Sequence, residues 1–234
     1  MTNQENNVTA DTSSIICTWD EQSDCANCGN NLKLNCKWDK NLLNGFLFIA
    51  FPYTIVAFLG IAVTGLLTGV WWPLIAMIAF FPAFFLVLEI RVLCSHCPFY
   101  GEDSKILHCL ANHGTPKLWR YRPEPLNKLE KISFLAGLLF FGGFPLLTQA
   151  NGIWFLVAHY EAYSLITLLG LIGIACATLL AAITMIACLM IHYCPKCVNF
   201  SCPLNKVPKS QVDEYLERNP LMKHAWEQRG YKLG

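Results

Sequence analysis

The sequence predicts an all-α membrane protein with four transmembrane helices, arranged as two pseudo-repeated hairpins that carry cysteine-rich cytoplasmic segments. Only 14% of the 234 residues are charged and 54% are hydrophobic, whereas about 25% of the residues in a soluble domain are charged. Two long apolar stretches each have room for two spanning helices. A C-x-x-C motif follows each stretch, and the chain contains 12 cysteines in all.

Two polar segments precede the first apolar stretch. We expect residues 1–16 to be a disordered leader, and they contain no apolar core of a secretory signal. Residues 17–40 form a separate cytoplasmic segment with four sulfur donors, enough for a self-contained metal site: Cys17, Cys25, Cys28 and Cys36. Without a metal this segment has too little apolar content to fold.

The first predicted hairpin covers residues 41–93. From Asn41 to Leu88 there is no Lys, Arg, Asp or Glu, and one spanning helix needs about 20 apolar residues. Two helices therefore fit, with a turn near residues 67–73. Buried helices of a soluble domain would be expected to show a polar stripe, which is absent here.

The central cytoplasmic loop, residues 94–131, contains the most specific pattern of metal ligands. Cys94 and Cys97 form a C-x-x-C knuckle, and Cys109 is followed at the fourth position by His113. If residues 103–114 form a helix, Cys109 and His113 point the same way and complete a four-ligand site. The ligand spacing resembles that of zinc fingers with two Cys plus a Cys/His pair, although no finger-like β-hairpin is evident.

The second predicted hairpin covers residues 132–193. Glu161 is the single formal charge between Ile132 and Ile191, so two further spanning helices fit. The sequence FLFIAFP at 46–52 is similar to LFFGGFP at 139–145, which favours two hairpins packed about a pseudo-twofold axis. The alternative is that hydrophobic helices look alike by composition.

The C-terminal cytoplasmic tail, residues 194–234, begins with three cysteines: Cys194, Cys197 and Cys202. Three thiolates are one short of a closed tetrahedral site, so His192 or a residue of another segment completes it, or one position stays open for chemistry. Cys202 followed by Pro203 is similar to the end of ferredoxin cluster motifs, but the full motif is missing. Zinc is therefore the first expectation and an iron-sulfur cluster the alternative.

The positions of the basic residues predict the orientation. All 17 Lys and Arg lie before the first helix, between the second and third, or after the fourth. Because basic loops stay inside, both termini and the central loop are expected to face the cytoplasm, in the cell membrane. Ten of the 12 cysteines lie in these segments, in a reducing compartment that favours metal binding over disulfides.

The function expected from these features is a zinc-stabilised membrane scaffold that docks soluble cytoplasmic partners. The alternatives are an iron-sulfur protein that transfers electrons, or an interfacial metal-dependent enzyme acting on a lipid-borne substrate, with Glu89 and His192 as its catalytic candidates. A fourth hypothesis is metal handling through exposed thiolates. A net charge of +1 gives no reason to expect a nucleic-acid partner. The expected partners are the lipid bilayer and a soluble cytoplasmic protein.

Overall fold

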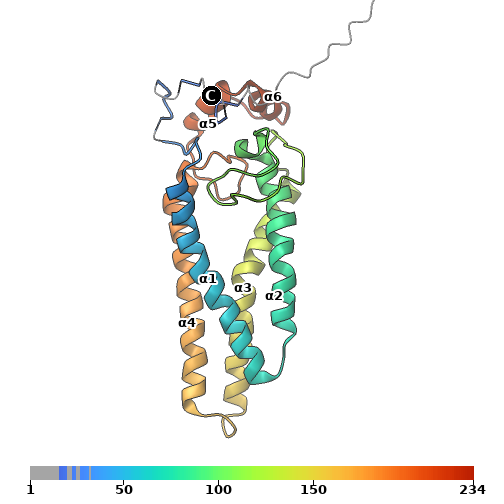
Figure 1. The fold of residues 1–234 in the computed structure, drawn as a ribbon, viewed down its shortest axis with the longest axis vertical. Helices are drawn as coiled ribbons and strands as arrows, with labels where there is room; N and C mark the ends of the chain where they lie inside the picture. The colour runs from blue at the N-terminus through green and yellow to red at the C-terminus, as the bar shows by residue number, and fades with distance from the viewer. Residues whose placement is uncertain (1–15, 20–22, 25–26, 32) are drawn as a thin grey trace, which may run out of the picture.

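The computed structural model describes residues 16–19, 23–24, 27–31 and 33–234, and within them it contains helices and no strand. Four helices are long and apolar enough to cross a membrane: Lys40–Thr68, Trp72–His96, Lys128–Ala158 and Leu165–Lys196. Figure 1 shows them running side by side as an elongated bundle, with the remaining segments gathered at one end. We call this end the head; it consists of the described residues of 16–39 together with 94–127 and 194–234. The predicted all-α fold with four apolar helices is confirmed.

The first two long helices begin and end where local chemistry dictates. Helix α1 (Lys40–Thr68) starts after Asp39, whose side chain accepts a hydrogen bond from the backbone N–H of Leu42, and it ends at Gly69 with φ of 75°. A short turn leads to α2 (Trp72–Pro82), which continues as the π-helical segment η2 (Ala83–Leu93). The change of helix type follows Pro82, which has no N–H to donate to the α-helical ladder.

The second pair of long helices has the same ending. Helix α3 (Lys128–Ala158) begins at a capping box made by Asn127 and Glu130, four residues before the predicted start at 132. Helix α4 (Leu165–Cys188) continues as the π-helical segment η5 (Leu189–Tyr193). Both α2 and α4 therefore pass through a π-helical segment immediately before their C-x-x-C motifs.

Short helices in the head complete the fold. The 3-10 turns η3 (Cys94–His96) and η6 (Cys194–Lys196) contain the starts of the two C-x-x-C motifs, and η4 (Pro98–Gly101) follows the first motif. The tail adds α5 (Lys209–Glu217) and α6 (Pro220–Gln228). Helix α5 begins directly after Pro208, and no side chain caps its first turn by a hydrogen bond.

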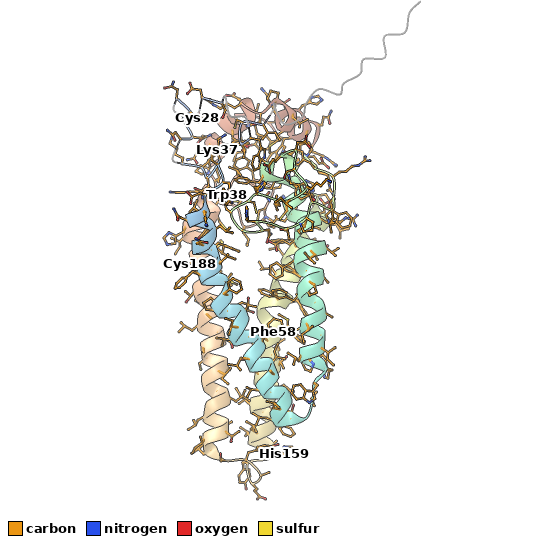
Figure 2. The ribbon with its side chains drawn as sticks, in the orientation of Figure 1. Cys28, Lys37, Trp38, Phe58, His159 and Cys188 are labelled. Carbon is orange, nitrogen blue, oxygen red and sulfur yellow. The ribbon has the colours of Figure 1, made fainter. Side chains whose placement is uncertain are left out.

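Polar contacts inside the bundle fix how the long helices lie against one another. The Tyr53 hydroxyl on α1 donates to the backbone oxygen of Phe141 on α3 at 2.7 Å, and Gln149 Nε2 donates to Thr178 Oγ1 on α4 at 3.1 Å. By contrast, most of each apolar helix faces outward, since only 17 to 33% of the most hydrophobic window of each helix is buried. Figure 2 places Phe58 within the bundle, Cys28 and Lys37 in the head, and His159 at the opposite end. The outward apolar surface is what a lipid bilayer would cover.

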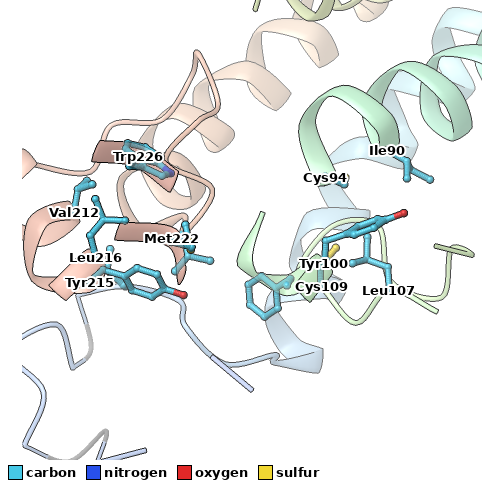
Figure 3. Packing of buried hydrophobic residues seen from close by; sticks show 13 residues of the cluster. Ile90, Cys94, Tyr100, Leu107, Cys109, Val212, Tyr215, Leu216, Met222 and Trp226 are labelled. Atoms are coloured by element: carbon cyan, nitrogen blue, oxygen red, sulfur yellow. The ribbon is translucent and has the colours of Figure 1, made fainter. Parts of the chain in front are cut away.

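The head has its own hydrophobic core. Figure 3 shows side chains of α5 and α6 on one side, among them Tyr215, Leu216 and Trp226, and side chains of the central loop on the other. Both groups belong to one cluster of buried residues, which also includes Ile90 at the end of the second long helix. The Trp226 indole donates to the backbone oxygen of Pro123 at 3.0 Å, so the tail is fastened to the central loop.

The close approach of α3 to α1 and α4 generates a prediction about Gly152. A Cβ at this position would lie 2.7 Å from Thr64 Cγ2 and 3.1 Å from Leu171 Cδ2. We expect Gly152→Ala to destabilise the bundle by about 1–3 kcal/mol, because the neighbouring side chains must move. Thermal unfolding in detergent micelles measures the effect.

Gly143→Ala is the matched control on the same helix, since a Cβ there meets nothing within 4 Å. It is expected to be neutral, or to stabilise by up to about 1 kcal/mol through helix propensity. Equal melting temperatures for the two variants would contradict the packing described for α1, α3 and α4.

Candidate metal centre

The two C-x-x-C motifs meet at the head end of the bundle although about a hundred residues separate them. In the first motif the Cys97 N–H donates to the Cys94 oxygen at 2.9 Å. The second motif begins in the 3-10 turn η6, and the Lys206 N–H of the later tail donates to the Cys194 oxygen at 3.2 Å. Asn199 joins the two turns directly, because its side-chain N–H donates to the backbone oxygen of Leu93 at 3.0 Å. Each motif directly follows the end of a long helix.

Six cysteines gather where the turns meet, and we call them the thiol cluster: Cys94, Cys97, Cys109, Cys194, Cys197 and Cys202. Burial raises the pKa of the Cys97 thiol well above its usual range. The charges of Cys197, Cys109 and Cys202 raise this pKa further, so Cys97 is near all three. Burial also raises the pKa of Cys109 and of Cys197 to about 11, and that of Cys202 to about 12. Without a bound cation these buried thiols therefore keep their protons at neutral pH.

Backbone N–H groups are directed at four of these sulfurs. In each case the residue two positions after the cysteine donates: Phe99 to Cys97, Ala111 to Cys109, Asn199 to Cys197 and Leu204 to Cys202. Cys109 also accepts from the Asn112 N–H at 2.9 Å. Each bond favours the thiolate over the thiol, the form in which cysteine binds metals.

A carboxylate lies beside two cysteines of the thiol cluster, Cys94 and Cys109. Glu89 projects from η2, and its charge acts on both Cys94 and Cys109. Its Oε1 accepts from Asn112 Nδ2 at 3.0 Å, whereas its Oε2 is buried without a hydrogen-bond partner. The same Asn112 side chain also lies 3.4 Å from Cys94 Sγ.

Aromatic and amide groups around the thiol cluster were not found by sequence reasoning. The Tyr121 hydroxyl is buried near Cys97, and burial, followed by the Cys97 charge, keeps its pKa above the usual range, so it remains an O–H donor. Asn205 donates to the backbone oxygens of Cys197 and Asn199 at 2.7 and 3.0 Å. A cysteine followed three residues later by asparagine is a weak sequence pattern: it occurs at Cys109 with Asn112 and at Cys202 with Asn205.

The predicted helix over residues 103–114 is wrong, and with it the geometric reason for His113 as a ligand. The segment instead forms a turn closed by the isolated bridge between Ile106 and Pro116, with Gly114 at φ of 83°. The Ser104 side chain bonds to the Ile106 oxygen instead of capping a helix. His113 consequently stacks on Trp38 of the N-terminal segment, with ring centroids 4.8 Å apart.

Three other histidines lie near the cysteines in the sequence, and each has neighbours of another kind. His108 pairs with Glu102 at 2.6 Å, and His96 Nδ1 contacts the backbone oxygen of Glu124. His192 is exposed on η5, two residues before Cys194. The structure thus brings together thiols and Glu89, and not the predicted mixture of thiols and imidazoles.

Part of the N-terminal cysteine group lies beside a pocket of about 630 Å³. Cys17, Cys28 and Cys36 line it, together with side chains from the start of α1 and from α5; Cys25 lies outside the described residues. The Cys17 N–H donates to Asn219 Oδ1 at 2.7 Å, and Asn219 Nδ2 lies 3.3 Å from Cys17 Sγ. The N-terminal segment is therefore held against the junction of α5 and α6.

The six cysteines of the thiol cluster are free thiols. Among the described residues, no group of three or more His, Cys, Asp or Glu side chains is placed so that it could hold a metal ion. The thiol cluster is therefore a set of neighbouring donors and not a completed coordination sphere. No protein family, curated protein or solved structure matches the chain.

The bond from Asn199 to Leu93 generates a prediction about how the two motifs are joined. We expect Asn199→Ala to destabilise the head by about 1–3 kcal/mol, because the half-buried Leu93 oxygen loses its donor. Asn41→Ala, at an exposed position near the start of α1, is the control and should change stability by less than about 0.5 kcal/mol. Limited proteolysis of the head in micelles distinguishes them; equal cleavage rates would contradict the predicted link.

Proposed function

We propose that this chain is an integral membrane metal-binding protein whose thiol cluster holds metal at the cytoplasmic face of the cell membrane, with zinc as the ion. One observation supports this most strongly. Thiols from two segments a hundred residues apart converge at the end of the helical bundle, and four of them accept backbone N–H bonds. A set of reduced, buried sulfur donors of this kind suits a divalent ion with a tetrahedral preference.

In this proposal the metal is structural. It joins the end of α2, the end of α4 and the central loop, so that the head is held in one arrangement on the membrane helices. Structural zinc contributes about 10–16 kcal/mol of apparent folding free energy in small domains, far more than a single hydrogen bond. The head would then act as a scaffold that docks soluble cytoplasmic partners, and the two hairpins would be related by a pseudo-twofold axis.

The residues of the N-terminal segment are proposed to hold a second, separate ion. The three described thiols Cys17, Cys28 and Cys36 surround one pocket, and Cys25 would supply the fourth sulfur. Lys37 donates to the backbone oxygens of Cys17 and Thr18 at 3.0 and 3.1 Å, which holds this loop in place beside the pocket.

An iron-sulfur cluster is the second candidate occupant of the thiol cluster, and the N–H bonds to sulfur suit it as well. An iron-sulfur protein would transfer electrons at the same face. The two occupants differ in absorption, since iron-sulfur clusters are brown and zinc thiolates are colourless. The proposed catalytic roles of Glu89 and His192 belong to a third, enzymatic alternative.

The test is the metal content of the full chain purified anaerobically in detergent. We expect a colourless protein that contains zinc, and we expect Cys97→Ser combined with Cys197→Ser to lose at least one ion per chain. Cys176→Ser and Cys188→Ser, on α4, are the matched controls and should keep the full metal content. Because thiols with raised pKa values must lose protons to bind metal, the ion should also be released as the pH falls.

Two results would contradict the proposal. One is a protein free of any bound ion when prepared without chelators. The other is unchanged metal content in the Cys97 and Cys197 double variant.

A further inference from the structure

A pocket of about 630 Å³ lies in the head where α1 begins. Its volume is within the range of about 300–1,000 Å³ that is usual for small-molecule sites. The wall includes residues from the first turn of α1, from the turn that ends the fourth long helix, and from α5 and its C-terminal end: Asn41, Leu42, Lys196, Tyr215 and Arg218. Residues of the N-terminal segment complete the described lining.

The pocket lies at the depth where two apolar helices end. The Tyr193 hydroxyl of η5 donates to the backbone oxygen of Leu42 at 3.3 Å, so the end of the fourth long helix lies against the start of α1. The apolar spans of these two helices begin at Lys40 and end at Lys196. Both basic residues therefore mark one boundary, which is the level of the lipid headgroups if a bilayer covers the outward apolar surface.

Positive charge exceeds negative charge around the pocket. Its charged lining consists of three basic and two acidic side chains: Lys37, Lys196, Arg218, Asp24 and Asp39. Both acids already accept hydrogen bonds from nearby backbone. Asp24 accepts from the Asn27 N–H at 3.1 Å, and Asp39 caps α1 by accepting from the Leu42 N–H at 2.8 Å. The acids therefore hold a turn and a helix start in place.

Two of the three cations have no acidic partner among the described residues. Lys196 and Arg218 are exposed, and neither belongs to any ion pair in that part of the chain. Lys37 differs, because its ammonium donates to the backbone oxygens of Cys17 and Thr18. A lysine and an arginine at one cavity suit a phosphate, since Arg presents two parallel N–H donors and Lys a compact charge.

The surface next to the pocket is apolar on the side of the bundle. Phe48, Phe51 and Ile55 on α1 are exposed large hydrophobic residues. Trp38, just before α1, is exposed as well, and tryptophan is enriched where proteins meet the membrane interface. Figure 2 shows Lys37 and Trp38 in the head, next to the start of α1. A ligand with an anionic head and apolar chains therefore matches both surfaces.

We propose that this pocket binds the headgroup of an anionic phospholipid, with Lys196 and Arg218 on its phosphate and its acyl chains along the exposed side of α1. The expected cytoplasmic position of the head agrees with this ligand, because anionic lipids give that leaflet its negative surface potential. The lipid goes beyond the proposed function, since it requires no metal in the thiol cluster. An ion at Cys17, Cys28 and Cys36 would take up only a small part of the pocket.

The first experiment is native mass spectrometry of the full chain in micelles of an uncharged detergent. Dioleoyl phosphatidylglycerol and dioleoyl phosphatidylcholine are compared, because they have the same chains and differ in the net charge of the headgroup. We expect one phosphatidylglycerol to bind per chain, about tenfold or more tightly than phosphatidylcholine, through charge-assisted hydrogen bonds to its phosphate. Equal affinities for the two lipids would overturn the proposal.

A soluble phosphate ester offers the same anionic group without the apolar chains. Glycerol 3-phosphate at the concentration of the lipid should leave phosphatidylglycerol bound, because the chains contribute to affinity along α1. Displacement of the lipid by this competitor would assign the pocket to soluble phosphate esters and overturn the membrane ligand.

The second experiment compares variants of the pocket. Lys196→Gln combined with Arg218→Gln should lower the affinity for phosphatidylglycerol by about tenfold or more, because both phosphate contacts are removed. The control combines Arg229→Gln with Lys232→Gln, which removes the same charge from exposed tail positions outside the pocket lining, and it should bind as wild type does. Equal affinities in the two double variants would overturn the site.

Asn41→Asp separates a lost contact from a damaged fold. It adds a negative charge to the wall of the pocket and favours the first turn of α1, where an acidic side chain is stabilising. We expect weaker binding of phosphatidylglycerol together with a melting temperature at or above that of wild type. Unchanged lipid affinity in this variant would contradict the proposed position of the headgroup.

Discussion

The structure of the head depends on one constraint: buried thiols and a buried carboxylate gather at the end of an apolar bundle, where unpaired negative charge is costly. Burial raises the pKa of Cys109, Cys197 and Cys202 well above neutrality. The site therefore destabilises an unpaired thiolate relative to the neutral thiol. At the same time, backbone N–H groups point at these sulfurs as they would at thiolates. The proposed metal ion would reconcile the two observations, because it would supply positive charge to thiolates in a buried site.

The long helices determine where that site can form. Both α2 and α4 end in a π-helical segment and then a 3-10 turn that contains the start of a C-x-x-C motif. Segments of π-helix are rare in proteins and are found mostly at functional sites. Here they lie directly before the C-x-x-C motifs, so the orientation of Cys94 and Cys194 is set by the long helices. Asn199 then fixes the distance between the two turns.

The sequence was sufficient to predict the bundle, because the absence of charge between Asn41 and Leu88 leaves few alternatives to spanning helices. It was not sufficient for the head. The helix predicted over 103–114 does not form, because a helix of twelve residues has little intrinsic stability. The burial of Leu107 and the turn at Gly114 determine the conformation of this segment instead. The proximity of Cys97 to Cys197 depends on how the two hairpins pack, and Asn112 acts through its side chain at contacts that no linear spacing encodes.

The most direct measurement of the central claim is X-ray absorption at the edge of the metal bound to the purified, anaerobically prepared chain. The account predicts a first shell dominated by sulfur at about 2.3 Å. A shell of nitrogen and oxygen at about 2.0–2.1 Å would contradict it, because the ion would then be bound by imidazoles or carboxylates away from the thiol cluster.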